Sequence, residues 1–355
     1  MQFVIEINKH LNKTEKSNEL SFFRRCLVIS SLGMLLFYSC KKDKIENVPA
    51  SSLPAPAFQY LNSSNSNLLS DSINALFPFN NQLFVCTAKG LSVYTSSGFI
   101  NYTTHNSGLP SDYVNCCFIT DSVWWVGTNA GLVKYSVTFQ QWQVFNISNS
   151  SLPNNKIRSI RMDKYGKVWV GTFTGGGVAS YDGVNWQVFT PSNSPLPSSS
   201  IARIFIQDSL YWFGTGGGLA RYNGNKWTIY TPGNSGLQSA WIYDIIEGAN
   251  ASLLFIATNN GINTFNLINN SWTYYNSTNS GLTGNFTRKL SYDKTKNMLW
   301  IATDGNGLFK SDGNQFTQYK YTGAGSLPSN YLTDVCLFNG KLWVATKENG
   351  LAIMQ

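Results

Sequence analysis

The side chains that could do chemistry in this sequence are aromatic, basic, acidic and amide residues that recur near one place in a repeated segment. They are Tyr113, Asn115, Arg158, Arg203, Trp241, Tyr243, Asp244, Phe286, Arg288, Tyr331 and Asp334. Aromatic faces stack, and guanidinium, amide and carboxylate groups form hydrogen bonds, so such a set could bind a sugar or a peptide. The alternative is that these residues only fill and solvate the mouth of a channel.

Two subsets of these residues could support catalysis. Asp244 and Asp334 could form the carboxylate pair of a glycoside hydrolase, in which one carboxyl group protonates the leaving oxygen. Tyr243, together with Arg203 or Arg288, could abstract a proton in a lyase reaction. Neither subset lies in a catalytic motif. We therefore expect a protein that is not an enzyme, and we keep a polysaccharide lyase or glycoside hydrolase as the third alternative.

Metal and cofactor sites have little support in the sequence. Only two histidines occur, and His105 is the only one beyond the N-terminal segment, which argues against His-rich metal sites. The cysteines have no metal-ligand spacing, and we expect those beyond residue 57 to be buried free thiols. The glycine-rich segments at 172–177 and 215–218 lie between expected strands, so we interpret them as turns and not as phosphate loops. We expect no metal and no cofactor.

The composition describes a folded, weakly charged chain of 355 residues. Charged residues make up 12% of the sequence, about half the usual share, whereas aromatic residues make up 14%. The formal net charge is +8, but part of the basic excess lies in residues 1–39 and the rest is scattered. A nucleic-acid surface needs clustered basic residues, so we expect no nucleic-acid partner.

Internal repeats position the candidate residues. A leucine follows an Asn/Ser/Gly-rich loop seven times, and these leucines mark blade starts near 68, 109, 152, 196, 237, 282 and 327. Each unit contains an aromatic and apolar segment that ends in threonine, such as Trp-Trp-Val-Gly-Thr at 124–128, followed by a glycine-rich turn. Short β-rich runs bounded by turns are strands, and four strands in each unit of about 40–45 residues are typical of a propeller blade.

The two ends of the repeat region complement each other. The seventh unit ends after three expected strands, whereas residues 58–67 match the fourth strand and following loop of the other units. An N-terminal strand that completes the last blade closes the circle and leaves few open sheet edges. We therefore predict an all-β, seven-bladed β-propeller of four-stranded antiparallel blades over residues 58–355, with residues 58–61 beside residues 350–355.

One repeated string indicates a family. It reads Trp-Val-Gly-Thr-Asn-Ala-Gly-Leu at 125–132 and Trp-Val-Ala-Thr-Lys-Glu-Asn-Gly-Leu at 343–351, and it resembles the two-component regulator propeller repeat. The resemblance covers residues 58–355. It implies a propeller like the periplasmic sensor half of hybrid histidine kinases, many of which respond to glycans. Here we expect a stand-alone bacterial lipoprotein without kinase or regulator domains.

The place of the candidate residues in the repeat favours a ligand site over a core role. In propellers, ligands usually bind where an outer strand leads into the next inner strand, and Tyr113, Trp241, Phe286 and Tyr331 occupy that place. The alignment around Phe286 is ambiguous by one residue, which affects the placement of Arg288 and of its neighbour Lys289. By contrast, nine of the eleven tryptophans recur at two fixed registers, which is the pattern of inter-blade core.

The N-terminal segment resembles a targeting signal. Arg24 and Arg25 precede a thirteen-residue apolar run at 26–38, which is too short for a membrane span and suits a signal peptide. The run leads into Ser39-Cys40, which resembles a bacterial lipoprotein cleavage site and implies a signal peptide at 1–39 and lipidation of Cys40. Residues 40–57 then form a Pro/Ser-rich tether. A signal peptide with an incidental cysteine is the alternative.

These observations combine into one expected function with alternatives. We expect an exported protein, lipid-anchored to the cell envelope and most simply to the outer membrane. Its propeller would recognise a glycan or glycan-bearing polymer at the mouth of the channel. A protein–protein scaffold in an envelope or secretion complex is the main alternative, and it would present a broad apolar patch in place of a recessed pocket.

Overall fold

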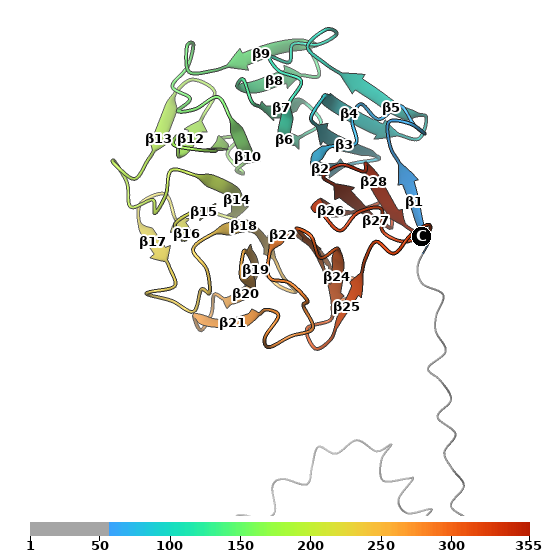
Figure 1. Cartoon of the computed structure of the whole chain (residues 1–355). Helices are drawn as coiled ribbons and strands as arrows, with labels where there is room; N and C mark the ends of the chain where they lie inside the picture. Colours follow the sequence, from blue (N-terminus) through green and yellow to red (C-terminus); the bar gives the residue numbers. More distant parts are fainter. Residues whose placement is uncertain (1–56) are drawn as a thin grey trace, which may run out of the picture. The chain divides into compact units, whose positions relative to one another are not determined.

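A computed structural model describes residues 57–355, which form strands, turns and loops. Twenty-eight strands make seven four-stranded antiparallel sheets, arranged as blades around a central axis (Figure 1). The prediction of an all-β, seven-bladed propeller is therefore confirmed. None of the residues described here forms a helix able to cross a membrane. The predicted signal peptide, Cys40 and all but the last residue of the tether lie outside the described residues.

The inner half of each blade surrounds the axis and holds most of the core. The inner strands are β2 (Ile73–Phe79), β6 (Val114–Ile119), β10 (Ile157–Met162), β14 (Ile201–Gln207), β18 (Ile242–Glu247), β22 (Thr287–Asp293) and β26 (Leu332–Phe338). The second strands are β3 (Gln82–Thr87), β7 (Val123–Thr128), β11 (Val168–Thr172), β15 (Leu210–Thr215), β19 (Leu253–Thr258), β23 (Met298–Thr303) and β27 (Lys341–Thr346). The second strands are almost wholly buried because their side chains pack against blades on both sides.

The outer half of each blade is more exposed. The third strands are β4 (Gly90–Thr95), β8 (Leu132–Ser136), β12 (Val178–Tyr181), β16 (Leu219–Tyr222), β20 (Gly261–Asn266), β24 (Leu308–Ser311) and β28 (Leu351–Met354). The outermost strands are β5 (Gly98–Tyr102), β9 (Gln141–Phe145), β13 (Trp186–Phe189), β17 (Trp227–Tyr230), β21 (Ser271–Tyr275), β25 (Phe316–Tyr319) and β1 (Phe58–Leu61). The repeated tryptophans belong to the second strands, where they are buried, and to the outermost strands, where they are half-buried.

The N-terminal strand closes the circle as predicted. β1 pairs antiparallel with β28, with Phe58 opposite Met354 and Leu61 opposite Leu351 (Figure 1). The Phe58 side chain is buried in the cluster that joins blade six to blade seven, and its ring lies edge-on to that of Tyr319 with centroids 6.4 Å apart. The seventh blade thus consists of strands from both ends of the described chain.

The loops between blades repeat one polar device. In six of the seven loops, an asparagine side chain accepts the N–H of the residue three positions earlier and donates to the carbonyl five positions earlier. Asn149, for example, accepts from the Asn146 N–H at 2.8 Å and donates to the Val144 carbonyl at 3.0 Å. The leucine that follows each loop is at most 4% exposed and packs between blades. These loops are therefore fixed, and they set where each inner strand begins.

A second polar device shapes the turn after each second strand. The threonine that ends this strand donates its hydroxyl to a glycine carbonyl across the turn in all seven blades, for example from Thr128 to Gly131 at 2.9 Å. The segments at 172–177 and 215–218 are two of these turns between strands, which agrees with their interpretation as turns and not as phosphate loops.

The tight contact between neighbouring blades predicts a measurable cost for one added methyl group. A Cβ at Gly171 would lie 2.6 Å from Ile201 Cγ2 of the next blade. We expect Gly171→Ala to lower the free energy of unfolding by about 1–3 kcal/mol, because overpacking shifts the backbone. Gly233→Ala is the matched control, since its Cβ would meet only the Thr231 hydroxyl at 3.9 Å. Chemical denaturation that ranks the two variants equally would contradict this account of blade packing.

Candidate functional site

The inner strands share one irregularity that builds the candidate site. Each has a register shift after its first residue, so one residue bulges out of the ladder. A β-bulge redirects a side chain and commonly occurs beside functional sites. We call the bulged residues the bulge ring: Asn74, Asn115, Arg158, Ala202, Tyr243, Arg288 and Thr333. The residues that follow form the middle ring: Ala75, Cys116, Ser159, Arg203, Asp244, Lys289 and Asp334.

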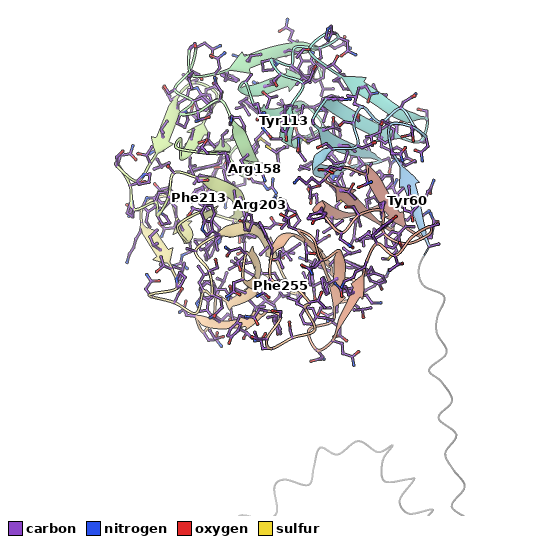
Figure 2. All side chains as sticks on the ribbon, in the orientation of Figure 1. Tyr60, Tyr113, Arg158, Arg203, Phe213 and Phe255 are labelled. Atoms are coloured by element: carbon purple, nitrogen blue, oxygen red, sulfur yellow. The ribbon has the colours of Figure 1, made fainter. Side chains whose placement is uncertain are left out.

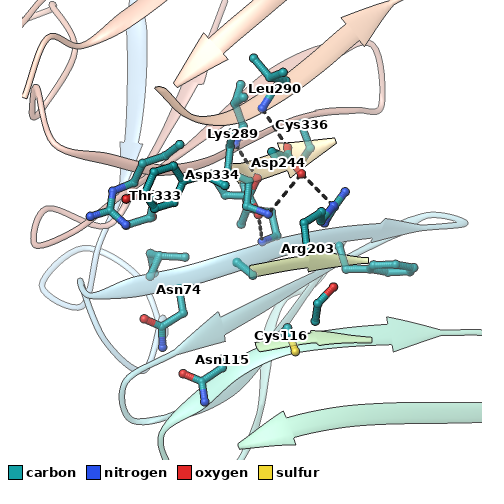
Figure 3. A pocket seen from close by; sticks show the side chains of 18 of the residues that line it. Asn74, Asn115, Cys116, Arg203, Asp244, Lys289, Leu290, Thr333, Asp334 and Cys336 are labelled. Atoms are coloured by element: carbon teal, nitrogen blue, oxygen red, sulfur yellow. Dashed lines mark hydrogen bonds and ion pairs between the residues drawn. The ribbon is translucent and has the colours of Figure 1, made fainter. Parts of the chain in front are cut away.

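Both rings line a cavity of about 600 Å³ on the propeller axis, which we call the lumen. Figure 2 labels Tyr113, Arg158 and Arg203 around the central opening, and Figure 3 labels several members of each ring from close by. Ligand sites typically occupy 300–1,000 Å³, so the lumen is large enough for a small molecule. Eight of the eleven predicted site residues line it: Tyr113, Asn115, Arg158, Arg203, Tyr243, Asp244, Arg288 and Asp334.

Asp244 is the electrostatic centre of the middle ring. Its carboxylate lies 2.7 Å from Arg203 Nε and 3.7 Å from Lys289 Nζ, and it also accepts the Leu290 N–H at 3.0 Å (Figure 3). The Asp244 side chain is only 1% exposed. The hydrogen bond from the Leu290 N–H to Asp244 joins blade six to blade five. The carboxylate therefore offsets two buried cations and fastens two blades together.

Asp334 has a similar structural role on the other side of the lumen. Its carboxylate accepts the Leu76 N–H of blade one at 2.9 Å and the Val335 N–H at 2.8 Å. Burial raises the pKa of Asp334 above its ordinary value. The Ser159 hydroxyl makes the corresponding bond to the Ile204 N–H at 2.9 Å. Three members of the middle ring thus join neighbouring blades, which gives both aspartates a structural task.

The bulge ring carries a cation with several partners. Arg288 pairs with Asp304, with Nη2 2.6 Å and Nε 3.1 Å from the same carboxylate oxygen. The Arg288 guanidinium also lies 5.0 Å from the centre of the Phe286 ring, and that ring packs against Tyr243 with centroids 4.8 Å apart. Phe286 therefore orients lumen residues from outside the lumen.

The aromatic residues of the mouth form an outer rim. Tyr113, Trp241 and Tyr331 are 39%, 50% and 55% exposed and come directly before inner strands. Trp241 lies over the turn at Gly216, where a Cβ would be 3.2 Å from the indole ring. Tyr331 lines a second cavity of about 550 Å³ beside blades six and seven. Trp241, Phe286 and Tyr331 are thus not among the residues that line the lumen.

Two lumen cations were missed or left uncertain by the sequence. Arg161 lines the lumen one step deeper than the middle ring, and Lys289 is a member of that ring. Arg158 contacts the ring of Phe173, whose centre is 5.9 Å from the guanidinium carbon. The available signal was the pair of arginines three residues apart on one inner strand. In a regular strand, residues three apart point to opposite faces, so the sequence pattern predicts that only one of the two arginines faces the lumen. The bulge at Arg158 breaks this alternation and lets both line the lumen.

The described cysteines are buried free thiols. Cys116 lines the lumen, and burial raises the pKa of its thiol to about 12. Cys86 and Cys117 lie in the core cluster between blades one and two. Within residues 57–355, no cluster of three or more His, Cys, Asp or Glu side chains could hold a metal ion.

The repeat sequence matches a known family model. Residues 151–174 match the model described as two component regulator propeller. Residues 151–174 thus carry the two-component regulator propeller repeat. This confirms the resemblance seen in the repeated string. No curated protein matches the sequence.

Solved structures that share the propeller come from proteins with different tasks. The extracellular domain of a protein described as a hybrid two-component system from B. thetaiotaomicron is 20% identical, with a TM-score of 0.71 over 85% of this chain and 42% of that one. PorZ, a surface component of the type-IX secretion system of Porphyromonas gingivalis, is 15% identical, with a TM-score of 0.63 over 80% and 46%. In both cases the chain spans less than half of the other structure.

A third similar structure belongs to an enzyme. It is a catalytically inactive histidine-to-alanine variant of virginiamycin B lyase from Staphylococcus aureus with quinupristin. It is 16% identical, with a TM-score of 0.66 over 84% of this chain and 98% of the lyase. At these identities the likeness establishes the fold and leaves the function to the site itself.

Proposed function

We propose that this propeller is a non-catalytic recognition module that binds a glycan or glycan-bearing polymer at the mouth of the lumen. The observation that carries the proposal is the exposed aromatic rim of Tyr113, Trp241 and Tyr331 around a recessed, charged cavity. Flat aromatic faces suit the apolar faces of sugar rings, and the polar groups of the bulge ring suit their hydroxyl groups. The extracellular sensor domains with the same fold are consistent with such a role.

The chemistry of the site favours recognition over catalysis. Asp244 and Asp334, the carboxylate pair predicted from the sequence, each accept a backbone N–H from the next blade. The similar lyase is inactive without one histidine, whereas the single histidine in the described part of this chain, His105, lies exposed in an inter-blade loop. A lyase mechanism here would need a different base, for which Tyr243 is the available candidate.

The proposed cellular location of the protein is inferred from the N-terminal sequence. We propose export and anchoring through a lipid on Cys40, with the propeller held at the envelope by the tether. The similar structures described as an extracellular domain and as a surface component of a secretion system support export. Mass spectrometry of the purified protein tests the anchor, because lipidation requires an N-terminal Cys40 carrying acyl chains.

Trp241→Ala provides the direct test of the glycan site. We expect the affinity for glycans identified on a broad array to fall at least about tenfold, because the exposed ring loses its stacking surface. Tyr165→Ala is the control, since Tyr165 is also an exposed aromatic residue but lies in the turn between β10 and β11, at the opposite end of the inner strand from the mouth. No binding across the array, or equal binding by both variants, would contradict the proposal.

A protein–protein scaffold is the second candidate. Phe139, Val184 and Ile268 are highly exposed apolar side chains in the hairpins of the outermost strands, and they lie on three different blades. The likeness to PorZ is consistent with such a role. A variant with serine at all three positions would lose an envelope partner and keep glycan binding if both candidates were correct for different surfaces.

A further inference from the structure

The lumen holds more positive than negative charge, and its carboxylates are all engaged. Six cationic and four acidic side chains line it. Besides Asp244 and Asp334, the acidic residues are Asp304, paired with Arg288 at 2.6 Å, and Glu247, paired with Lys294 at 2.6 Å. Each carboxylate thus already has a cation or backbone N–H groups as partners. The excess positive charge must be found among the cations.

Three lumen cations carry this excess: Arg158 and Arg161, both on β10, and Lys347. None of the three has a carboxylate within 4.0 Å among the residues that the structure describes. Arg158 has only the face of Phe173, and Arg161 donates to the adjacent Ile160 carbonyl at 2.7 Å. Two guanidinium groups with five donors each therefore project toward the lumen with most of their hydrogen-bonding capacity unused.

The surroundings of these arginines are unfavourable for positive charge. Desolvation lowers the pKa of Arg158, and desolvation together with the nearby Arg203 guanidinium lowers the pKa of Arg161 to about 9. Guanidinium groups stay protonated in proteins, so both side chains are cations. Lys289 adds another buried cation, and it shares Asp244 with Arg203. Arg158 is exposed and Arg161 is half-buried, and both line the lumen, so an incoming anion can reach both guanidinium groups and offset positive charge that has no carboxylate partner.

We propose that the lumen binds an anionic group of the ligand, a carboxylate or a sulfate or phosphate ester carried by a sugar, with Arg158 and Arg161 as its binding residues. Guanidinium groups bind these oxyanions through paired, charge-assisted hydrogen bonds. The Thr333 hydroxyl of the bulge ring is a further donor, since it has no partner among the described residues. The proposal rests on the proposed function for the sugar, whose ring would lie at the aromatic rim.

The test compares charged and neutral probes on the full chain in a non-ionic detergent. Calorimetry would measure binding of glucuronate, glucose 6-sulfate, glucose 6-phosphate, glucose and inorganic sulfate. We expect the three charged sugars to bind at least tenfold more tightly than glucose, and the ester arms to distinguish a sulfate or phosphate ligand from a carboxylate. A double variant with Arg158→Gln and Arg161→Gln should bind the charged sugars at least tenfold more weakly than the parent protein does.

Arg221→Gln is the matched control. Among the described residues, Arg221 is the one arginine that does not line the lumen. It lies on β16 over the Trp212 ring. This variant should bind all probes as the parent protein does. Equal affinity for glucuronate, the two esters and glucose, or charged-probe affinity that survives both lumen substitutions, would overturn the inference.

The two proposals can fail separately. If neutral glycans bind at the rim but charge gives no advantage, the anion site is wrong and the recognition module stands. If inorganic sulfate binds through Arg158 and Arg161 but no sugar does, the glycan assignment is wrong and the anion site stands.

A thermal measurement guards against a merely structural role. Without an anion, Arg161→Gln should leave the melting temperature unchanged or raise it, because it removes a half-buried charge that lacks a carboxylate partner among the described residues. A large fall in melting temperature without loss of anion binding would show that Arg161 supports the fold and not the ligand.

Discussion

Phe58→Ala is expected to lower the free energy of unfolding by about 3–5 kcal/mol, the cost typical of removing a buried phenylalanine. Phe58 begins the strand that completes blade seven, and its ring is buried against blade six beside Tyr319. The substitution leaves a cavity between blade six and blade seven. Chemical denaturation followed by tryptophan fluorescence measures the change.

Gln59→Ala serves as the control for this prediction. Gln59 lies on the same strand with its side chain exposed, so its replacement should change stability by no more than about 0.5 kcal/mol. If both variants unfold at the same denaturant concentration, then closure through β1 contributes little and the ring is stable without it. A separate early transition in Phe58→Ala would instead show that blade seven opens before the rest.

Asp244→Ala is expected to cost about 3–5 kcal/mol, as is usual when one partner of a buried ion pair is removed. The carboxylate is 2.7 Å from Arg203 and also holds the Leu290 N–H, so its loss leaves a buried guanidinium and a backbone donor without their acceptor. Lys289, 3.7 Å away, loses its counter-ion as well. The free energy of unfolding measures the total.

A double substitution separates the charge from the hydrogen bond. Adding Arg203→Met to Asp244→Ala removes the stranded cation, so the double variant should be more stable than Asp244→Ala alone. Asp121→Ala is the surface control, because Asp121 is exposed and accepts only from Asn80. A double variant less stable than the single one would contradict the electrostatic explanation.

The fold could be predicted from the sequence because the repeat records burial directly. Leucines such as Leu152 return in every unit, and the Trp-x-Gly/Ala-Thr segment returns in five of the seven, because each blade packs against the next in the same way. The last unit lacks a fourth strand, and residues 58–61 form a strand that belongs to no unit of their own. Together these observations predict that residues 58–61 complete the last blade and close the ring. Both inferences depend on spacing along the chain, which is visible without coordinates.

The site was less predictable because it depends on a local departure from regular strand geometry. The bulge after the first residue of each inner strand brings Arg158 and Ser159 into successive rings and turns Arg161 toward the same lumen. The sequence also placed Asp244 and Asp334 among candidate catalytic groups. The two aspartates accept the N–H groups of Leu290 and Leu76 only because neighbouring blades have a particular offset along the propeller axis. The amino-acid sequence alone does not specify that offset.

The hydrogen bonds between neighbouring blades also bear on how such a protein can diversify. Asp334, Ser159 and Asp244 fasten adjacent sheets, and replacing them would loosen the ring. Arg158, Ala202 and Tyr243, one step nearer the solvent, make no such fastening bonds within the described chain. Asn74, by contrast, donates to the Val114 carbonyl of blade two at 2.7 Å and belongs to the fastening set. Substitutions can therefore accumulate at Arg158, Ala202 and Tyr243 while the scaffold persists, so relatives with the same architecture could acquire unlike ligand preferences through a handful of exchanges.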